Sequence, residues 1–314
     1  MSNLSVRVLV AVVAIPLILL LATAGGFYFF GFVAILSAFA LHEFYGIARA
    51  KGTRPQAGIG LMFGFCINAA FFHAKLQNAV LGVLERSGIA LPLPSMTQLF
   101  LILVLLFVSL IFAVELFRNT GSALANIAAT IVGSFYVSAF LSTLVGLREL
   151  FTPEVFPVYR YFDTVGVSAP PEVAETIYEW GGLTIVAVFA SVWVCDSAAY
   201  FAGRAFGKRK LFERVSPNKT WEGAIAGVLF AVAAFVLIQR AALPYLEFTD
   251  ALVCGAIVGV FGQLGDLVES LLKRDAGLKD SSALIPGHGG ILDRFDSLLF
   301  VSPLIFLYMD FIVF

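Results

Sequence analysis

Long apolar segments separated by short polar connections are the main pattern along this chain. Each segment is continuously apolar rather than alternating, and several approach the roughly 20 residues that an α-helix needs to cross a bilayer. The pattern predicts nine membrane-spanning helices, at about 6–24, 26–41, 57–73, 99–117, 125–146, 181–202, 223–243, 250–272 and 291–314. We therefore expect an all-α polytopic integral membrane protein.

Composition and charge support this class and suggest an orientation. The chain is 60% hydrophobic and 13% charged, and its mean hydropathy is +0.94, which excludes an ordinary soluble globular protein. The connections between spans 2 and 3, 4 and 5, 6 and 7, and 8 and 9 hold 13 of the 20 Lys and Arg residues. By the positive-inside rule we expect this side to be cytoplasmic and both termini to lie on the opposite side.

The chain reads as one membrane-embedded unit with two parts. Residues 1–180 would form N-terminal helices and connections, and 181–314 a C-terminal catalytic region. Segments 74–98 and 147–180 are expected to be connections outside the membrane. The three cysteines lie in apolar spans without a CxxC pair, so neither a disulfide framework nor a zinc set is expected. Nothing in the sequence suggests a nucleic-acid partner.

The segment from Asp266 to Asp296 concentrates charge between two apolar runs. It holds 10 of the 41 charged residues of the chain. Charge beside a hydrocarbon environment is unfavourable, so such side chains face a bundle interior or a water-filled cavity. The alternative to a functional site is an Asp–Lys or Glu–Lys ion pair that neutralises itself at the membrane boundary. One helical stripe carries four polar side chains, Asp266, Glu269, Ser270 and Lys273.

The last span begins with a second acidic cluster. Asp293, Arg294 and Asp296 follow the glycine-rich sequence PGHGG at 286–290. Glycines let the backbone approach a ligand closely, and the amides at a helix start can bind phosphate. Two acidic clusters joined by a Gly- and Lys-containing loop can converge on one Mg²⁺, which takes one or two carboxylates together with substrate phosphates.

A third polar segment joins spans 6 and 7. It begins near Asp196 and contains six cations between 203 and 223. Lys208 to Lys210 are more typical of a membrane-surface anchor than of a binding site. The sequence SPNKT, at 216–220, reads as a tight turn whose donors could hold a phosphate or a base edge. GRAFGKR lacks the spacing of a P-loop.

The segment SLLKRDAGLKDSSALIPGHGGILDRFD, from Ser270 to Asp296, closely resembles the signature of the phosphatidate cytidylyltransferases, also called CDP-diacylglycerol synthases. That signature runs S-x-x-K-R, four residues, K-D, then H-G-G-x-x-D-R-x-D, and every fixed position is filled. The upstream blocks DSAAYFAGRAFGKRKL and SPNKTWEG are also similar to the family. The resemblance is specific over about 190–300, whereas the N-terminal half resembles the family only as a bundle of apolar spans.

The resemblance implies that CTP and phosphatidic acid react to give CDP-diacylglycerol and pyrophosphate, with Mg²⁺ and room for a second cation. It also implies a homodimer, in a bacterial inner membrane. The distribution of Lys and Arg residues predicts that the active-site cavity faces the cytoplasm. The implied catalytic residues are Asp266, Asp293, Lys273, Arg294 and His288. The implied metal ligands are Asp266 and Asp293, supported by Glu269 and Asp296. The implied substrate- and nucleotide-binding residues are Ser216, Asn218, Lys219, Ser270, Arg274, Lys279, Gly289, Gly290 and Asp196.

Three other functions fit part of the pattern. An ion-coupled transporter would use membrane carboxylates to carry protons or a coupling ion, but it leaves the cations and glycines of the connections unexplained. A CTP-dependent lipid or polyprenol kinase shares the substrates and transfers the γ-phosphate instead. A membrane scaffold without activity leaves the mixed charge clusters unexplained.

Overall fold

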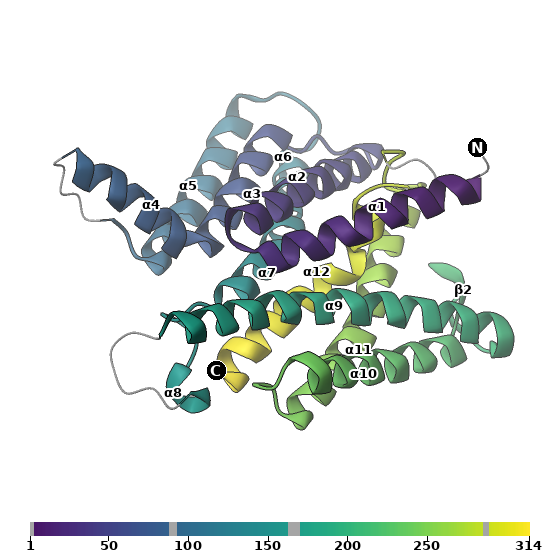
Figure 1. Ribbon diagram of the computed structural model, residues 1–314. Coiled ribbons are helices and arrows are strands. Elements are labelled where there is room, and N and C mark those ends of the chain that lie inside the picture. The colour runs from purple at the N-terminus through teal and green to yellow at the C-terminus, as the bar shows by residue number, and fades with distance from the viewer. Residues whose placement is uncertain (1–2, 88–92, 163–169, 285–288) are drawn as a thin grey trace.

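The computed structural model describes residues 3–87, 93–162, 170–284 and 289–314. Almost all of its regular structure is helical, with one two-stranded sheet in which β1 and β2 run antiparallel (Figure 1). The helices are α1 Asn3–Ala24, α2 Gly26–Ala50, α3 Ala57–Phe71, α4 His73–Arg86, α5 Met96–Phe117, α6 Ala123–Gly133, α7 Phe140–Glu149, α8 Val158–Tyr161, α9 Pro171–Phe206, α10 Trp221–Ala242, α11 Phe248–Asp275 and α12 Leu292–Tyr308. Two π-helical segments, η1 Ser134–Ala139 and η2 Met309–Val313, continue α6 and α12, and the strands are β1 Lys210–Phe212 and β2 Ser216–Thr220.

The apolar segments form helices as predicted, and the all-α membrane class is confirmed. Among the described residues, seven helices or continuous helix pairs are long and apolar enough to cross a membrane. The pair α3 and α4, bent by 86°, would make an eighth. In α1 the apolar part is the shorter stretch Val10–Ala24, so the count of nine spans stays a prediction.

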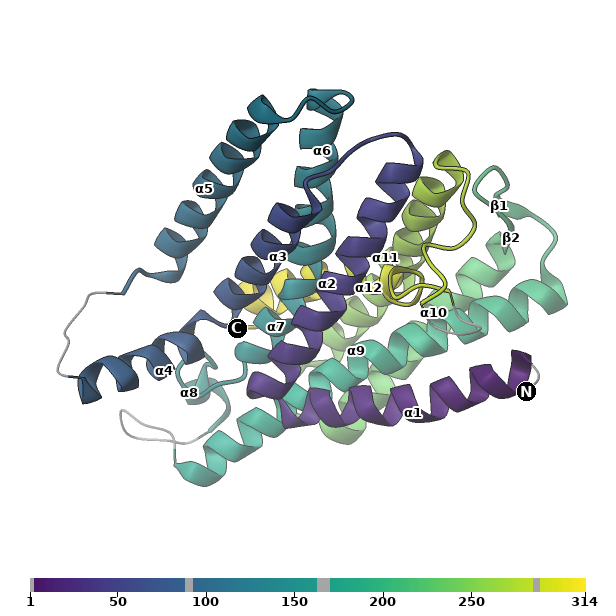
Figure 2. The same ribbon diagram turned by 90° about the horizontal axis from the view of Figure 1, so that it is seen from above.

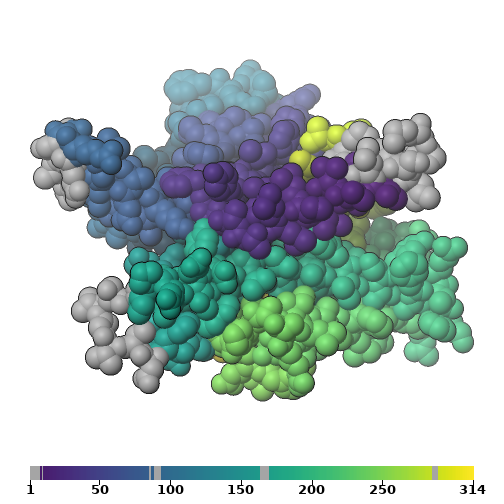
Figure 3. Space-filling model, in the orientation of Figure 1, coloured from purple at the N-terminus to yellow at the C-terminus, as the bar shows by residue number. Residues whose placement is uncertain are grey.

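Helices α9, α10, α11 and α12 pack side by side, and α1 lies along α9 (Figures 1 and 2). The space-filling view shows α1 crossing this face of the molecule against α9 (Figure 3). Glycines allow the close packing of α10 and α11. A Cβ at Gly255 or Gly259 would lie 2.6 or 2.7 Å from the Cα of Val232 or Val228. The buried core contains residues from both halves of the chain.

Polar connections from distant parts of the chain meet at one end of the bundle. The Lys51 ammonium, after α2, lies 2.9 Å from the carboxylate of Asp275 at the end of α11. The amide of Arg54 donates to Asn126 Oδ1 at 2.6 Å, and Arg118 donates to the Arg54 carbonyl. These contacts join the connections between spans 2 and 3, 4 and 5, and 8 and 9.

Both termini were expected on the side opposite to the cations, and this prediction was wrong. The first half of α1 lies near the β1–β2 hairpin, whereas the C-terminus lies at the other end (Figures 1 and 2). There Phe314 packs against Phe151, Phe156 and Tyr245. An odd number of crossings separates the two termini, so the expectation did not follow from nine spans.

Two local predictions also change. The helix expected from 181 begins at Pro171, so the last part of the expected 147–180 connection is helical. At 36 residues, α9 is about 54 Å long and therefore extends well beyond a hydrocarbon layer of about 30 Å. The expected tight turn at 216–220 is instead strand β2. Thr220, at its end, caps α10 by accepting a hydrogen bond from the amide of Gly223.

Candidate active site

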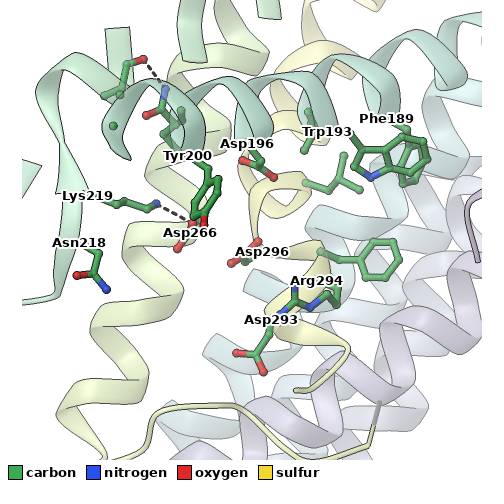
Figure 4. Close-up of a pocket in the computed structure, with 18 of the residues that line it drawn as sticks. Phe189, Trp193, Asp196, Tyr200, Asn218, Lys219, Asp266, Asp293, Arg294 and Asp296 are labelled. Atoms are coloured by element: carbon green, nitrogen blue, oxygen red, sulfur yellow. Dashed lines mark hydrogen bonds and ion pairs between the residues drawn. The ribbon is translucent and has the colours of Figure 1, made fainter. Parts of the chain in front are cut away.

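A cavity of about 810 Å³ lies at the end of the bundle where the polar connections meet. It is formed by α1, α9, the β1–β2 hairpin, and parts of α10, α11 and α12, with the polar residues at its centre (Figure 4). The sequence-predicted site residues that line it are Asp196, Asn218, Lys219, Asp266, Asp293, Arg294 and Asp296. Residues more than 90 positions apart are thus brought to one place.

Three carboxylates from three helices point toward the same part of the cavity. They belong to Asp196 on α9, Asp266 on α11 and Asp296 on α12 (Figure 4). A glycine makes the last two neighbours possible. A Cβ at Gly265 would clash with the carbonyl oxygen of Asp296 and would lie 3.2 Å from the Asp296 carbonyl carbon and the Ser297 Cα, so a side chain there would push α12 away from α11.

Asp266 is held by partners on both of its oxygens. The Lys219 ammonium, carried by β2, lies 2.6 Å from Oδ2. The Ser270 hydroxyl, one turn further along α11, donates to Oδ1 at 3.3 Å. The predicted residues Lys219 and Ser270 therefore both contact Asp266. The hairpin places the Lys219 ammonium next to the carboxylates of the cavity.

A second charged group lies beside the cavity and includes Asp293, which also lines it. The Lys273 ammonium lies 2.5 Å from Glu269 Oε2 and also contacts Asp293 Oδ1. The three side chains are 9%, 1% and 6% exposed respectively, so this network is almost fully withdrawn from solvent. Asp293 Oδ2 also accepts hydrogen bonds from the amides of Ser281 and Gly290, at 2.9 and 2.7 Å. Asp293 is thus fixed firmly in place.

The carboxylate set fits a divalent cation. Within the described parts of the chain, no three His, Cys, Asp or Glu side chains are grouped closely enough to hold a metal ion by themselves. Mg²⁺ needs no such complete protein shell, because it commonly takes one or two carboxylates and fills its remaining positions with water and phosphate oxygens. Asp196, Asp266 and Asp296 could supply those carboxylates from one side of the cavity. Asp293 is less available, because it has four donors among the described residues, from Lys273, Ser281 and Gly290, whereas Asp266 has two.

The other sequence-predicted residues lie around the cavity rather than along it. Ser216 starts β2, opposite Phe212, and Lys279 is exposed. Arg274 is also exposed and donates to the Leu278 carbonyl. Gly289 has a φ of +81°, which favours glycine, and packs next to Asp293. His288 lies outside the described residues.

The amides at the start of α12 are not free for a phosphate. Those of Ile291 and Leu292 donate to the two carboxylate oxygens of Glu43, at 3.0 and 2.8 Å, and that of Gly290 donates to Asp293. Sequence reasoning missed Glu43. Its signal was present, because Glu43 is the only acidic residue of the largely apolar helix α2, and a carboxylate in a membrane helix usually has a function.

The family model that matches this chain is described as the cytidylyltransferase family, and the match covers residues 5–312. This chain belongs to the cytidylyltransferase family. It is 33% identical over 304 residues to a phosphatidate cytidylyltransferase of Synechocystis sp., across 96% of this chain and 95% of that protein. It is 51% identical over 117 residues to the phosphatidate cytidylyltransferase of Bacillus subtilis, and 47% identical over 137 residues to that of Haemophilus influenzae. These two alignments cover 37% and 42% of this chain, and 43% and 47% of the relatives.

Membership of the cytidylyltransferase family confirms the resemblance that the signature from Ser270 to Asp296 indicated. The match also extends over the N-terminal helices, where the sequence had offered only apolar spans. This extent agrees with the structure, in which α1 lines the cavity and Glu43 on α2 contacts the start of α12.

Proposed function

We propose that this protein is a phosphatidate cytidylyltransferase, which converts CTP and phosphatidic acid to CDP-diacylglycerol and pyrophosphate. One observation carries the proposal. Three charged residues of the family signature, Asp293, Arg294 and Asp296, line one cavity together with Asp196, Lys219 and Asp266, and the same cavity has an apolar wall on α1 and α9. A lipid phosphate and a nucleotide triphosphate need such a polar chamber, and the acyl chains need an apolar side toward the membrane.

The apolar wall is suited to the lipid. On α1 it includes Val10, Ala14 and Ile18, and on α9 it includes Phe189 and Trp193. Acyl chains against this wall remain in an apolar environment, which avoids transferring them into water. The phosphatidate headgroup would then enter the polar centre and present a phosphate oxygen to the α-phosphorus of CTP.

The polar centre is suited to the phosphates. A divalent cation such as Mg²⁺, held by Asp196, Asp266 or Asp296, would neutralise charge on the triphosphate, and a second cation is compatible with the same carboxylates. Lys219 and Arg294 line the same chamber and would bind the phosphates directly. Asn218, beside Lys219, offers an amide to the nucleotide. Positioning and charge neutralisation provide most of the catalysis in such transfers.

The buried network beside the chamber would set its shape. Lys273 joins Glu269 on α11 to Asp293 on α12, and Asp293 in turn holds the glycine-rich approach to α12. This role is one of positioning, because Glu269 is fully buried. The assignment of Asp293 as a metal ligand stays a prediction, as do the substrate contacts of Ser216, Arg274, Lys279, Gly289 and His288.

We further propose a bacterial inner-membrane location with the cavity open to the cytoplasm, where CTP is made. The gathering of the Lys- and Arg-rich connections at the cavity end supports this orientation. Residues 181–314 would form the catalytic region, supported by the helices of 1–180. A homodimer, with no nucleic-acid partner, remains our expectation for the assembly, and the mass of the purified protein in detergent would test it.

The reaction itself is tested by following two labels. Purified protein in lipid would receive Mg²⁺, phosphatidic acid, and CTP labelled on either the α- or the γ-phosphate. We expect the α-label to enter the lipid and the γ-label to leave in pyrophosphate in equal amount. Entry of the γ-label into the lipid would instead identify a kinase, and entry of neither label would reject both activities.

A further inference from the structure

Glu43 connects the N-terminal helices to the catalytic end of the molecule. It lies on α2 and is only 5% exposed. Its Oε1 accepts from the Ser282 hydroxyl at 2.6 Å and from the Ile291 amide at 3.0 Å. Its Oε2 accepts from the Ser281 hydroxyl and the Leu292 amide, both at 2.8 Å. All four acceptor positions of the carboxylate are therefore used.

These bonds hold two separate pieces of the loop between α11 and α12. Ser281 and Ser282 lie before the residues outside the described ranges, and Ile291 and Leu292 lie after them. Because one carboxylate binds both pieces, it fixes where the loop returns to the membrane helix. It also replaces the missing intrahelical partners of the first α12 amides, as a capping side chain does, although it comes from another helix.

The link continues from Glu43 to Asp293. The Ser281 hydroxyl lies 2.8 Å from Glu43 Oε2 and 2.9 Å from Asp293 Oδ2, and the Ser281 amide donates to the same Asp293 oxygen. Gly290 lies between the two acids. A Cβ at Gly290 would be 2.7 Å from the Glu43 carboxyl carbon, so the second glycine of HGG leaves the space that this contact occupies.

We propose that Glu43 is a positioning residue for the reaction, which orients Asp293 and the start of α12 through Ser281 and the Ile291 and Leu292 amides. The side chain does not line the cavity, so it acts through these partners and not on the substrate. This role rests on the proposed function only in its kinetic consequences, because the hydrogen bonds themselves can be tested without turnover.

Glu43→Gln is the sharpest variant. It keeps the size of the side chain but replaces one acceptor oxygen by an NH₂ group. A serine hydroxyl can turn to accept from that group, whereas a backbone amide cannot, so the Ile291 or Leu292 amide loses its partner. Partners that orient functional groups typically contribute about 10- to 100-fold to activity. We expect kcat to fall by about tenfold or more, with little change in KM for CTP.

Glu115→Gln is the matched control. Glu115 on α5 is also 5% exposed, and it accepts from Gln56 before α3, Arg118 after α5 and Asn126 on α6, none of which lines the cavity. Both variants remove one buried acceptor, so a purely structural effect would lower the melting temperature and the activity of both alike. A positioning role lowers kcat only for Glu43→Gln.

Hydrogen exchange on the full-length protein in lipid supplies a readout that needs no activity. We expect faster exchange of the Ile291 and Leu292 amides in Glu43→Gln and unchanged exchange in Glu115→Gln. If Glu43→Gln folds poorly, Ser281→Ala and Ser282→Ala give the same test. Of these two serines only Ser281 contacts Asp293, so Ser281→Ala should lower kcat more than Ser282→Ala. Unchanged exchange, or equal losses of kcat in the paired variants, would overturn the proposal. A wild-type protein without label transfer would reject the proposed function instead, and the exchange result would still decide whether Glu43 holds the loop.

Discussion

Replacing Lys273 by methionine should destabilise the protein strongly. The ammonium sits between the carboxylates of Glu269 and Asp293, and all three side chains are less than 10% exposed. Methionine keeps most of the volume and removes the charge, so two buried carboxylates would face each other without a cation. Breaking a buried ion pair in this way costs about 3–5 kcal/mol. At roughly 2–4 °C per kcal/mol, we expect the melting temperature to fall by about 10 °C.

Lys51→Met is the matched control for this prediction. Its ammonium also contacts a carboxylate, that of Asp275 at 2.9 Å, but the two side chains are 54% and 61% exposed. Exposed pairs contribute about 0–1 kcal/mol, so the control should melt within a few degrees of the wild type. A thiol-reactive fluorophore can follow unfolding, because Cys195 and Cys254 are buried in the folded protein.

A double variant separates charge from packing. Adding Glu269→Gln to Lys273→Met removes one of the unpaired carboxylates and should restore part of the lost stability. Two results would contradict this description of the network between α11 and α12. Lys273→Met could have the melting temperature of the wild type, or adding Glu269→Gln could lower the melting temperature of Lys273→Met further.

Three further results are expected. Asp293→Asn should abolish label transfer without preventing membrane insertion, because it removes the charge that faces the buried ammonium, and near-normal activity would remove Asp293 from the site. Gly290→Ala should lower kcat, because its methyl group would meet the carboxylate of Glu43, and wild-type kcat would contradict that contact. Ala14→Trp adds bulk to the apolar wall of the cavity and should raise KM for long-chain phosphatidic acid more than for a short-chain analogue. The control Val13→Trp changes a residue that is 60% exposed and does not line the cavity, so it should not have this effect. Equal effects of the two variants would place the lipid elsewhere.

The sequence predicted the helices well because each continuous apolar run has few other stable structures in a membrane. It also predicted most of the cavity residues, since charge inside an apolar region is conspicuous. The start of α9 was missed because its first turns carry Glu172, Glu175 and Glu179, which read as an extramembrane connection. Glu43 was missed because its partners lie more than 230 residues away, and no local pattern reveals a contact of that kind.

The predicted meeting of Asp266 and Asp293 shows a second limit of sequence reasoning. Helical spacing placed each residue on the polar face of its own helix, and both do line the cavity. It gave no information on what else each carboxylate contacts. Asp293 is held by Lys273, Ser281 and Gly290. Asp266 has fewer partners, Lys219 and Ser270, and faces the carboxylates of Asp196 and Asp296 in the chamber. Only the packing of α9, α11 and α12 distinguishes these two situations.

The most direct test of the account is an experimental structure of the protein in lipid with Mg²⁺ and a non-reacting CTP analogue. We expect the triphosphate inside the cavity, next to Lys219, with the cation against one or two of Asp196, Asp266 and Asp296. A triphosphate bound elsewhere, such as along the exposed cations at 208–210 outside the cavity, would contradict the central claim that the signature residues form one nucleotide and lipid site.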